Sequence, residues 1–579
     1  MYNLLYLLLR RMRTPLIVVI LAYAISILGL VLIPGMDDQG NPWRMSFFHA
    51  FYFVSFMGST IGFGEIPYPF TDPQRIWTTV AMYMTVISWL YAIGSLFSIL
   101  QDPSFKRILA FTTFSREVKA MREPFYMVCG MGGAGKLVVS ELAAHDIRSV
   151  VIDRDETKIQ MLRLEELPIH VPGLAGDVTD TSTLLAAGLK KKQCQGVIAL
   201  TGSDQTNLTI AITSKLLVPE RTVICRAEDH DNQVNIASFG TDYIINPFDS
   251  FAKRFAMMFQ SPSMYLVYEW MTSMHEAPLS DFAEPPRGTW VVCGYGRFGK
   301  AVQQSLSFKG IQTVIIEADP ELTNAPEGAV IGRGTEAITL LEAGVEDAVG
   351  LIAGTDDDAN NLSIIMTAKK INADLFIVAR QNLSSNDILF TNVKADVTIN
   401  PGRLIGQRVV DLITTPLLSD FLRVAREQTE EWANVLVSRV VGVLTDRPPE
   451  SWVITLSKKE TPAIHELLMK GAEVTLCHLL TDPRDIAVSL PCVALYVKDI
   501  DHREKLLPEG DRRLHIGDQL LICGQPDAET HMRWSAHNLH ALTYICTGKD
   551  SPCGSLWRRL DAREQASSNT PMVARDMQD

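Results

Sequence analysis

The chain has 579 residues, which at roughly 150 residues per domain suggests about four structural units. Lys and Arg total 53 against 66 Asp and Glu, and the resulting net charge of −13 argues against a nucleic-acid-binding protein, because phosphate contacts need clustered cations. The nine cysteines are scattered, with none before Cys129, so the sequence predicts no disulfide framework and fits a reducing compartment.

Two long uncharged segments lie near the N-terminus, at residues 14–36 and 76–101. Each is long enough to cross a hydrocarbon core of about 30 Å as a helix, and a cleaved signal peptide would explain only one of them. Basic residues precede the first segment, in residues 1–13, and follow the second. The positive-inside rule therefore predicts a multi-pass protein of the inner (plasma) membrane with both termini in the cytoplasm.

The segment between the two spans, residues 45–64, is again uncharged and rich in aromatic residues. A third full span would place the part of the chain after residue 101 outside the cytoplasm. The basic residues that follow the second span argue against this, because such residues stay on the cytoplasmic side. We therefore expect a re-entrant segment, a pore helix over about 45–58 followed by a non-helical run up to residue 65. Non-helical backbone at membrane depth exists only where it is buried in protein or lines water. The alternative is a glycine-rich turn between two anchoring helices.

The run Thr60-Ile61-Gly62-Phe63-Gly64 resembles the Thr-Val-Gly-Tyr-Gly selectivity filter of potassium channels. The resemblance implies that four copies of this loop, in a homotetramer embedded in the lipid bilayer, replace the hydration shell of permeant K⁺ with rings of carbonyl oxygens. Glycines allow the alternating backbone that this requires. Glu65 would stand at the outer mouth and attract cations. Phe63 lacks the phenol that could tie the filter to the pore helix.

Gly94 lies two-thirds of the way along the second span. Glycine lowers the cost of bending a helix, so Gly94 is a candidate gating hinge, and close helix packing is the alternative explanation. The basic residues 103–123 follow, and we expect them to form a helical linker.

The rest of the chain contains a duplicated α/β domain. A strand, a Gly-x-Gly-x-x-Gly turn, a helix and a second strand ending in an acid occur at residues 125–153 and again at 289–317, with the acid 18 positions after the third glycine in both copies. Later positions pair at a single offset of 154, as Arg226 does with Arg380 and Asn246 with Asn400. The predicted domains are residues 124–284 and 287–428.

Each copy meets the stricter condition for a dinucleotide fingerprint, because a strand precedes the glycines, a helix follows them and an acid ends the next strand. The glycines let the backbone approach a pyrophosphate at a helix N-terminus. Asp153 and Glu317 would hold ribose hydroxyls and favour NAD over NADP. Arg333 replaces Asp177 in the second copy, which favours a phosphate-rich adenine nucleotide or fills the site. The alternative is a Rossmann fold without a ligand.

The residues expected to bind nucleotide in the first domain are Gly130, Met131, Gly132, Gly133, Ala134, Gly135, Asp153, Arg154, Asp177, Thr201 and Asp204. Those expected in the second domain are Gly294, Gly296, Arg297, Phe298, Gly299, Glu317 and Arg333.

The turn at 176–180, the Thr-x-x-Asp-x-x-Asn strand end at 201–207 and the Asn-Pro pair at 246–247 resemble those of RCK domains, the regulators of K⁺ conductance of the TrkA N-terminal type. The resemblance implies that the following helices, about 247–274 and 402–427, exchange between neighbouring subunits. Residues 430–526 resemble the C-terminal lobe of this family. We expect the tail, residues 527–579, to be flexible.

A run of three acids, Asp356-Asp357-Asp358, stands at a strand end. Its oxygens are a candidate Ca²⁺ site, as in some tandem-RCK channels, and a solvated acidic loop is the alternative.

The predicted fold is a membrane α-helical pore hairpin with a re-entrant pore loop, followed by two α/β Rossmann-like RCK domains and an α+β C-terminal lobe. The predicted function is a potassium channel, and not an enzyme, gated by NAD or an adenine nucleotide and by Ca²⁺. One alternative is a membrane-anchored NAD-dependent oxidoreductase, for which no acid/base residue is recognisable. Another is a non-conducting regulatory subunit.

Overall fold

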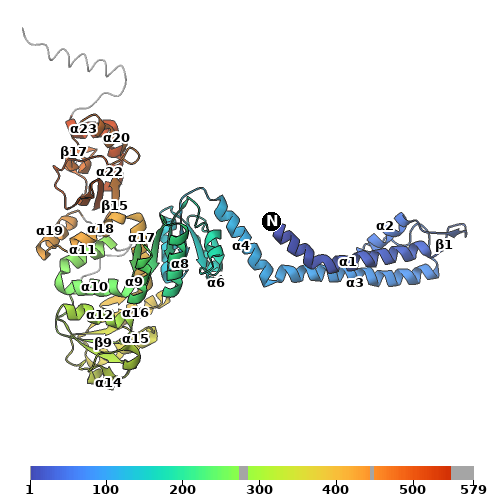
Figure 1. Ribbon diagram of the computed structural model, residues 1–579, viewed down its shortest axis with the longest axis horizontal. Coiled ribbons are helices and arrows are strands. Elements are labelled where there is room, and N and C mark those ends of the chain that lie inside the picture. Colours follow the sequence, from blue (N-terminus) through green and yellow to red (C-terminus); the bar gives the residue numbers. More distant parts are fainter. Residues whose placement is uncertain (1, 273–283, 444–448, 549–579) are drawn as a thin grey trace, which may run out of the picture. The chain divides into compact units, whose positions relative to one another are not determined.

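The computed structural model describes residues 2–272, 284–443 and 449–548, and Figure 1 shows its ribbon. The chain forms two compact units, Met1–Arg122 with Ala186–Gly188, and Glu123–Leu185 with Leu189–Asp579.

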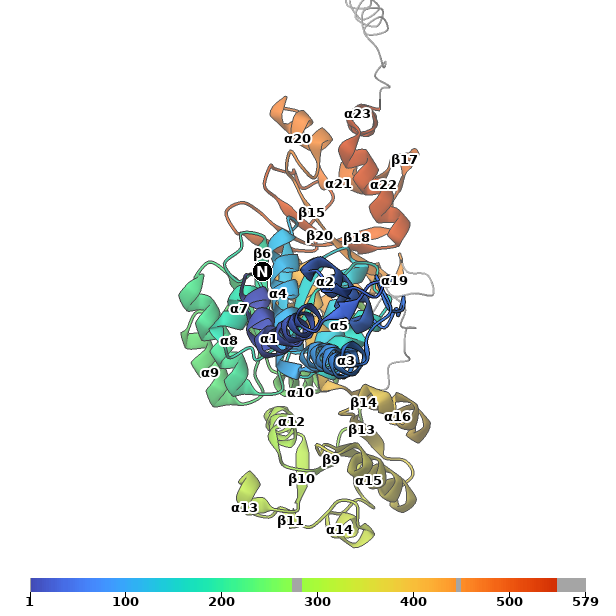
Figure 2. The same cartoon turned by 90° about the vertical axis from the view of Figure 1, so that its right-hand side faces the viewer.

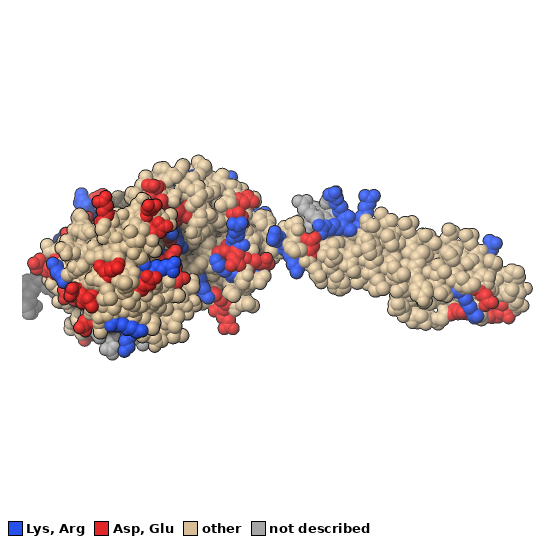
Figure 3. Space-filling view, turned by 90° about the horizontal axis from the view of Figure 1, so that it is seen from below, with Lys and Arg blue, Asp and Glu red and all other residues tan. Residues whose placement is uncertain are grey.

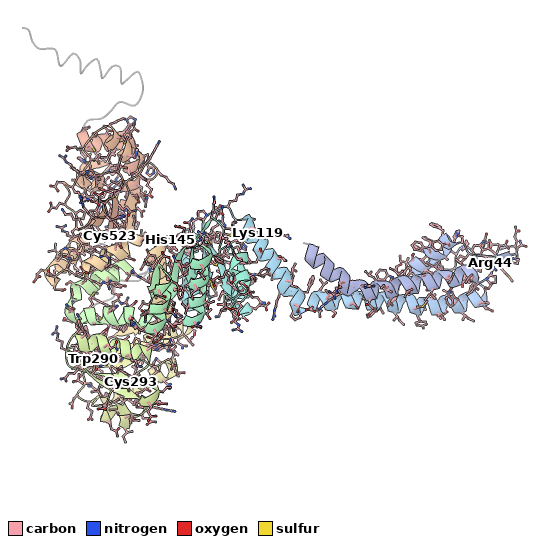
Figure 4. The ribbon with its side chains drawn as sticks, viewed as in Figure 1. Arg44, Lys119, His145, Trp290, Cys293 and Cys523 are labelled. Atoms are coloured by element: carbon pink, nitrogen blue, oxygen red, sulfur yellow. The ribbon has the colours of Figure 1, made fainter. Side chains whose placement is uncertain are left out.

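The first unit is mostly helical. Its elements are α1 (Tyr2–Leu32), β1 (Gly35–Met36), β2 (Pro42–Trp43), α2 (Phe47–Gly58), α3 (Asp72–Gln101) and α4 (Pro103–Ala120). Helices α1 and α3 pack along each other and α2 packs against both. Both long helices are apolar enough to cross a membrane, over Arg10–Leu32 and Asp72–Gln101. On the face seen in Figure 3, this unit carries its charged residues at its two ends, and Figure 4 places Arg44 and Lys119 at these opposite ends.

Indole side chains of α3 fix it against α1. A Cβ atom at Gly29 would come within 2.0 Å of the Trp77 ring, so only glycine lets the two helices approach this closely. The Trp77 indole N–H donates to the Ser26 carbonyl oxygen at 3.1 Å, and that of Trp89 donates to the Tyr23 hydroxyl at 2.9 Å. Each of these two indole donors therefore has a partner on the facing helix.

The first α/β domain is a parallel sheet in the order β5-β4-β3-β6-β7-β8. Its strands are β3 (Phe125–Cys129), β4 (Arg148–Asp153), β5 (Gly173–Ala175), β6 (Cys194–Ala199), β7 (Thr222–Arg226) and β8 (Tyr243–Ile245). Its helices are α5 (Gly133–Ala144), α6 (Glu156–Leu164), α7 (Thr181–Ala186), α8 (Asp204–Leu217) and α9 (His230–Ser238). The central strands are buried apolar runs, as expected for a parallel sheet covered on both faces.

The second α/β domain repeats this topology in the order β11-β10-β9-β12-β13-β14, and Figure 4 labels Trp290 and Cys293 on its central strand. Its strands are β9 (Thr289–Cys293), β10 (Gln312–Glu317), β11 (Val330–Ile331), β12 (Gly350–Ala353), β13 (Phe376–Arg380) and β14 (Val397–Ile399). Its helices are α12 (Arg297–Phe308), α13 (Pro320–Thr323), α14 (Ala337–Glu342), α15 (Asp358–Ile371), η1 (Ser384–Asn386) and α16 (Asp387–Val393). The strand order is that of a Rossmann fold, which confirms the predicted fold class.

The helices after β8 and β14 are each broken in two, so the prediction of one continuous helix in each place is wrong. They are α10 (Pro247–Gln260), α11 (Pro262–Thr272), α17 (Pro401–Thr414) and α18 (Pro416–Ala425). The breaks fall at Pro262 and Pro416, equivalent positions of the repeat, because proline lacks an amide donor and disfavours helical backbone at the preceding residue.

Helix α10 packs on α12 of the second domain, and α17 packs on α5 of the first; Figures 1 and 2 show α10 beside α12. Phe251 and Phe255 join the core around Trp290, and Val409 joins the core around Val138. The exchange implied between neighbouring subunits therefore takes place, in this structure, between the two α/β domains of one chain. Each domain completes its core with a helix of the other.

The C-terminal lobe is an antiparallel sheet in the order β15-β20-β18-β19, with helices on both faces. Its elements are α19 (Glu430–Val441), β15 (Glu450–Thr455), α20 (Pro462–Met469), α21 (Leu476–Leu480), β16 (Thr481–Asp482), β17 (Asp485–Ser489), β18 (Cys492–Lys498), β19 (Glu504–Leu506), β20 (Gln519–Gly524), α22 (Pro526–His537) and α23 (Leu539–Thr547). The expectation of a flexible tail is wrong over 527–548, because Met532 and Leu542 are fully buried in this lobe. Residues 549–579 lie outside the described residues.

Candidate functional sites

The loop after α2 has left-handed backbone at three alternate positions. The φ angle is +60° at Thr60, +69° at Gly62 and +100° at Gly64. The Ile61 amide donates to the Phe56 carbonyl oxygen at 3.0 Å, which ties the start of the loop to the last turn of α2. Backbone that alternates in this way can direct successive carbonyl groups toward one side, as an ion filter requires.

Phe63 contacts the short helix through its ring. Its centroid lies 5.4 Å from that of Phe56, with the ring planes at 76°, an edge-to-face contact of the kind that stabilises aromatic pairs. From the sequence, only the loss of a phenol is expected at this position. The structure shows an apolar contact that holds the loop to α2 in its place.

Glu65 is tied to the start of α3. Its Oε1 accepts a hydrogen bond from Arg75 Nε at 2.9 Å, and its Oε2 accepts one from the Phe70 amide at 2.8 Å. The cation-attracting carboxylate expected at the outer mouth is therefore partly neutralised by Arg75 within the same chain.

Helix α3 runs without interruption through Gly94. A Cβ atom at position 94 would meet nothing within 4 Å, so packing within this chain does not require glycine there. Just beyond α3, Asp102 accepts the Ser104 amide at 2.8 Å as the N-cap of α4 and pairs with Arg11. The predicted linker is thus a capped helix that starts at an ion pair.

The glycine turn of the first domain joins β3 to α5. Gly130 has φ +105°, and a Cβ atom at Gly135 would lie 1.9 Å from the Gly130 carbonyl oxygen, so both positions need glycine. The N-cap residue of α5 is Gly132, which has no side chain to cap the helix, and this leaves the first amides of α5 available to an anion. Asp153, at the end of β4, accepts the Met131 amide at 2.5 Å.

Of the other residues predicted for this site, two are exposed and two form hydrogen bonds that support the local fold. Arg154 and Asp177 are exposed, and the hydrogen bond from the Thr179 hydroxyl lowers the pKa of Asp177. Thr201 donates to Asn207 Oδ1 at 2.7 Å. Asp204 accepts the amides of residues 228 and 229, both at 2.9 Å. Thr201 and Asp204 thus stabilise the loop at the end of the strand. Asn207, which accepts the Thr201 hydroxyl, was not among the predicted site residues, although it belongs to the repeated motif.

The glycine turn of the second domain has the same construction. Gly294 has φ +93°, and a Cβ atom at Gly299 would lie 2.0 Å from its carbonyl oxygen. The N-cap residue of α12, Gly296, has no side chain to cap the helix. Glu317 Oε2 accepts the Tyr295 amide at 2.6 Å. The residue at the end of the second strand therefore braces the glycine turn in both domains.

A cavity of about 500 Å³ lies at this second turn, within the size range of small-molecule sites. The predicted residues that line it are Gly294, Gly296, Arg297, Glu317 and Arg333. Phe298 is fully buried instead and contacts Phe248. Arg380 also lines the cavity, with its guanidinium 4.9 Å from the Phe248 ring centroid. The repeat had marked Arg380 only as the partner of Arg226.

Two carboxylates of the acidic run hydrogen-bond to nearby backbone and side-chain groups. Asp357 Oδ1 caps α15 by accepting the Asn360 amide at 2.8 Å. Asp358 Oδ1 accepts the Asn382 amide at 2.6 Å, and its Oδ2 accepts Asn386 Nδ2 at 2.7 Å. Within the described part of the chain, no group of three or more His, Cys, Asp or Glu residues is arranged to hold a metal ion. The Ca²⁺ site expected at residues 356–358 therefore stays a prediction, and in this structure Asp357 serves as a helix cap and Asp358 as a support of the neighbouring loop.

Comparison with known families agrees with this architecture. Residues 15–102 match the ion channel family, and residues 126–247 and 290–401 each match the TrkA-N domain. The chain thus combines an ion channel domain with two TrkA-N domains.

Two of the similar proteins are named as potassium channels. Potassium channel protein 1 of Methanocaldococcus jannaschii is 27% identical over 232 residues, 40% of this chain and 65% of that protein. The voltage-gated potassium channel Kch of Escherichia coli is 24% identical over 37% of this chain and 49% of its own. An uncharacterized protein of Methanothermus fervidus is 27% identical, covering 39% of this chain and 34% of that protein. The chain thus spans about half the length of these relatives.

Among solved structures, the GsuK channel bound to NAD covers 92% of this chain and 99% of its own, at 15% identity and a TM-score of 0.43. GsuK bound to ADP covers 71% of this chain and 99% of its own, at 18% identity and a TM-score of 0.41.

Proposed function

We propose that the protein is a potassium channel whose pore is gated by nucleotides bound to its TrkA-N domains. The observation that carries the proposal is the left-handed backbone at alternate positions of Thr60–Gly64, between two helices long enough to span a membrane. A homotetramer of such loops would surround one axis with rings of carbonyl oxygens. The basic residues outside both spans favour an inner-membrane protein with both termini in the cytoplasm.

The first TrkA-N domain is proposed to bind NAD and the second an adenine nucleotide. Open amides at the starts of α5 and α12 suit a phosphate, and Asp153 and Glu317 stand where ribose hydroxyls are held in Rossmann folds. The second cavity adds Arg297, Arg333 and Arg380, which suit a ligand with more accessible phosphate charge.

Gating would follow from linkage. A ligand that prefers one arrangement of the TrkA-N domains shifts the pore equilibrium by its difference in affinity between the two states. Helix α4 follows α3 directly and is the proposed path from the domains to the pore.

Single-channel recording tests the proposal. The purified full-length protein in planar bilayers, with K⁺ on one side and Na⁺ on the other, should give a reversal potential that follows K⁺. NAD and then ADP, the ligands bound in the similar GsuK structures, should each change the open probability. The matched control is Gly62→Ala, which places a side chain at φ +69° and should abolish current while nucleotide binding persists.

Two other results would change the proposed function. A K⁺ current indifferent to both nucleotides would retain the channel and remove the ligands. Absence of current from protein that still binds NAD would favour a membrane-anchored oxidoreductase or a regulatory subunit.

A further inference from the structure

Arg297 lines the cavity of the second domain and also forms an ion pair with the first domain. It is the first residue of α12 and lines the cavity at the second glycine turn. Its Nη1 atom lies 2.8 Å from Oε2 of Glu228, which follows β7 in the first domain. Its guanidinium carbon lies 6.0 Å from the ring centroid of Phe248, on the exchanged helix α10. One cation therefore joins the cavity of the second domain to the first domain.

Glu228 is held firmly in place. Its side chain is 9% exposed and also pairs with Arg226, and its amide donates to Asp204. A nearly buried carboxylate with two guanidinium partners is well compensated. If Arg297 turned away, Arg226 would still balance the charge of Glu228, so the pair with Arg297 can open without leaving a buried charge alone.

The other half of the repeat lacks this link. Gly133 occupies the position of Arg297 in the first glycine turn, and Asn382 stands at the position of Glu228. The Asn382 amide group donates to Asp358 Oδ1 at 3.0 Å and to the Thr355 carbonyl oxygen at 3.3 Å, both in its own domain. The ion pair therefore joins the first domain to the cavity of the second, and the repeat carries no equivalent charged pair at the first glycine turn.

We propose that Glu228 sets the anion affinity of the second cavity by competing with a nucleotide phosphate for Arg297. The inference rests on the proposed binding of an adenine nucleotide there. A phosphate at the start of α12 would offer the guanidinium a doubly hydrogen-bonded partner, in a position favoured by the helix N-terminus. Binding the phosphate and keeping the Arg297–Glu228 pair are then alternatives, so the contact between the domains weakens as the cavity fills, and the coupling is reciprocal.

Calorimetric titration of the full-length protein in detergent with ADP tests this competition. Glu228→Gln should tighten ADP binding by about fivefold or more, the lower end of the usual range for coupled sites, and Arg297→Gln should weaken it. The double variant should bind ADP no more tightly than Arg297→Gln alone. Glu228→Asp keeps the charge beside Arg226 and shortens the reach to Arg297, so it should also tighten binding if the Gln variant fails to fold.

Asp356→Asn is the matched control. Asp356 also lines the cavity, and among the described residues its carboxylate has no ion pair or hydrogen bond, so its removal reports the general effect of one negative charge. That effect should be the same with and without Arg297. Unchanged or weaker ADP binding in Glu228→Gln overturns the inference, and so does a gain that persists alongside Arg297→Gln.

A further variant separates this inference from the proposed function. Arg333 lines the same cavity and has no contact with Glu228. If Arg333→Gln weakens ADP binding while Glu228→Gln leaves it unchanged, the nucleotide site stands and the competition is overturned. If neither Arg333→Gln nor Arg297→Gln affects ADP binding, the ligand is elsewhere, and the proposed site and the inference fail together.

Discussion

The Asp411 carboxylate accepts a hydrogen bond from Gln407 Nε2 at 3.0 Å, one turn earlier on α17. Asp411 is buried beside a cavity of about 930 Å³ between the exchanged helices. Equivalent positions of the repeat line this cavity: Arg254 corresponds to Arg408, and Met257 corresponds to Asp411. Burial raises the pKa of Asp411 to about 7, against the opposing effects of Gln407 and Arg408.

This carboxyl group should make stability depend on pH. Between about pH 4 and pH 7 the folded protein keeps the Asp411 proton that the unfolded chain releases, so the free energy of unfolding falls as pH rises through this window. Asp411→Asn removes this dependence, and at pH 8 it should be more stable than the unmodified protein by on the order of 2 kcal/mol. Thermal unfolding of the detergent-solubilised protein from pH 5 to pH 8 measures the effect, and an equally steep decline in the variant would contradict it.

The Phe56–Phe63 contact predicts how substitutions act on the proposed filter. Phe56→Ala should remove an aromatic pair worth about 0.5–1.5 kcal/mol beyond its buried area, and should reduce the K⁺ over Na⁺ permeability ratio measured from reversal potentials. Phe63→Tyr keeps the ring and should retain the ratio. Equal selectivity in Phe56→Ala and the unmodified protein would show that the contact does not support the filter.

Substitutions at two glycines near the start of α12 should have different effects, one on the stability of the domain and the other on ADP binding. A methyl group at Gly299 meets the Gly294 carbonyl oxygen, whereas one at Gly296 meets nothing within 4 Å. Gly299→Ala should therefore destabilise the domain by about 1–3 kcal/mol, the usual cost of overpacking. Gly296→Ala should keep its unfolding temperature and weaken ADP binding, because its methyl group occupies the approach of a phosphate. Calorimetry and thermal unfolding of both variants test this contrast, and unchanged ADP affinity in Gly296→Ala would argue against a phosphate at this turn.

The fold followed from sequence wherever its signal was local or repeated. Uncharged runs predicted α1 and α3, and the offset of 154 predicted two sheets of one topology. The breaks at Pro262 and Pro416 were also visible in the chain but were outweighed by the long apolar pattern around them. Partners distant in sequence could not be predicted, because the packing of α10 on α12 depends on how Phe248 and Phe298 meet in space.

The sites show the same division. The glycine turns and their acids are local motifs, and the structure brings Asp153 and Glu317 onto the turns of their own domains. At the run 356–358, the hydrogen bonds from Asn382 and Asn386 to Asp358 could not be predicted from the sequence, because these partners come from a distant segment. Helix α22 was missed because its apolar residues are sparse, although Ala528, Met532 and Ala536 recur at helical spacing. Helix α23 is largely apolar and was assigned to the tail together with the polar residues that follow it.

Gly94 remains to be tested as a hinge, and its surroundings define the experiment. Because no atom lies near its missing Cβ, Gly94→Ala adds no clash within the chain and stiffens α3 by about 1 kcal/mol, the difference in helix propensity between the two residues. If opening requires α3 to bend, the ratio of open to closed time should fall by about fivefold. Ser98→Ala, on an exposed position of the same helix, is the control and should leave that ratio unchanged. Single-channel recording at fixed nucleotide concentration measures both variants, and an unaltered open probability in Gly94→Ala would place the gate motion elsewhere along the helix.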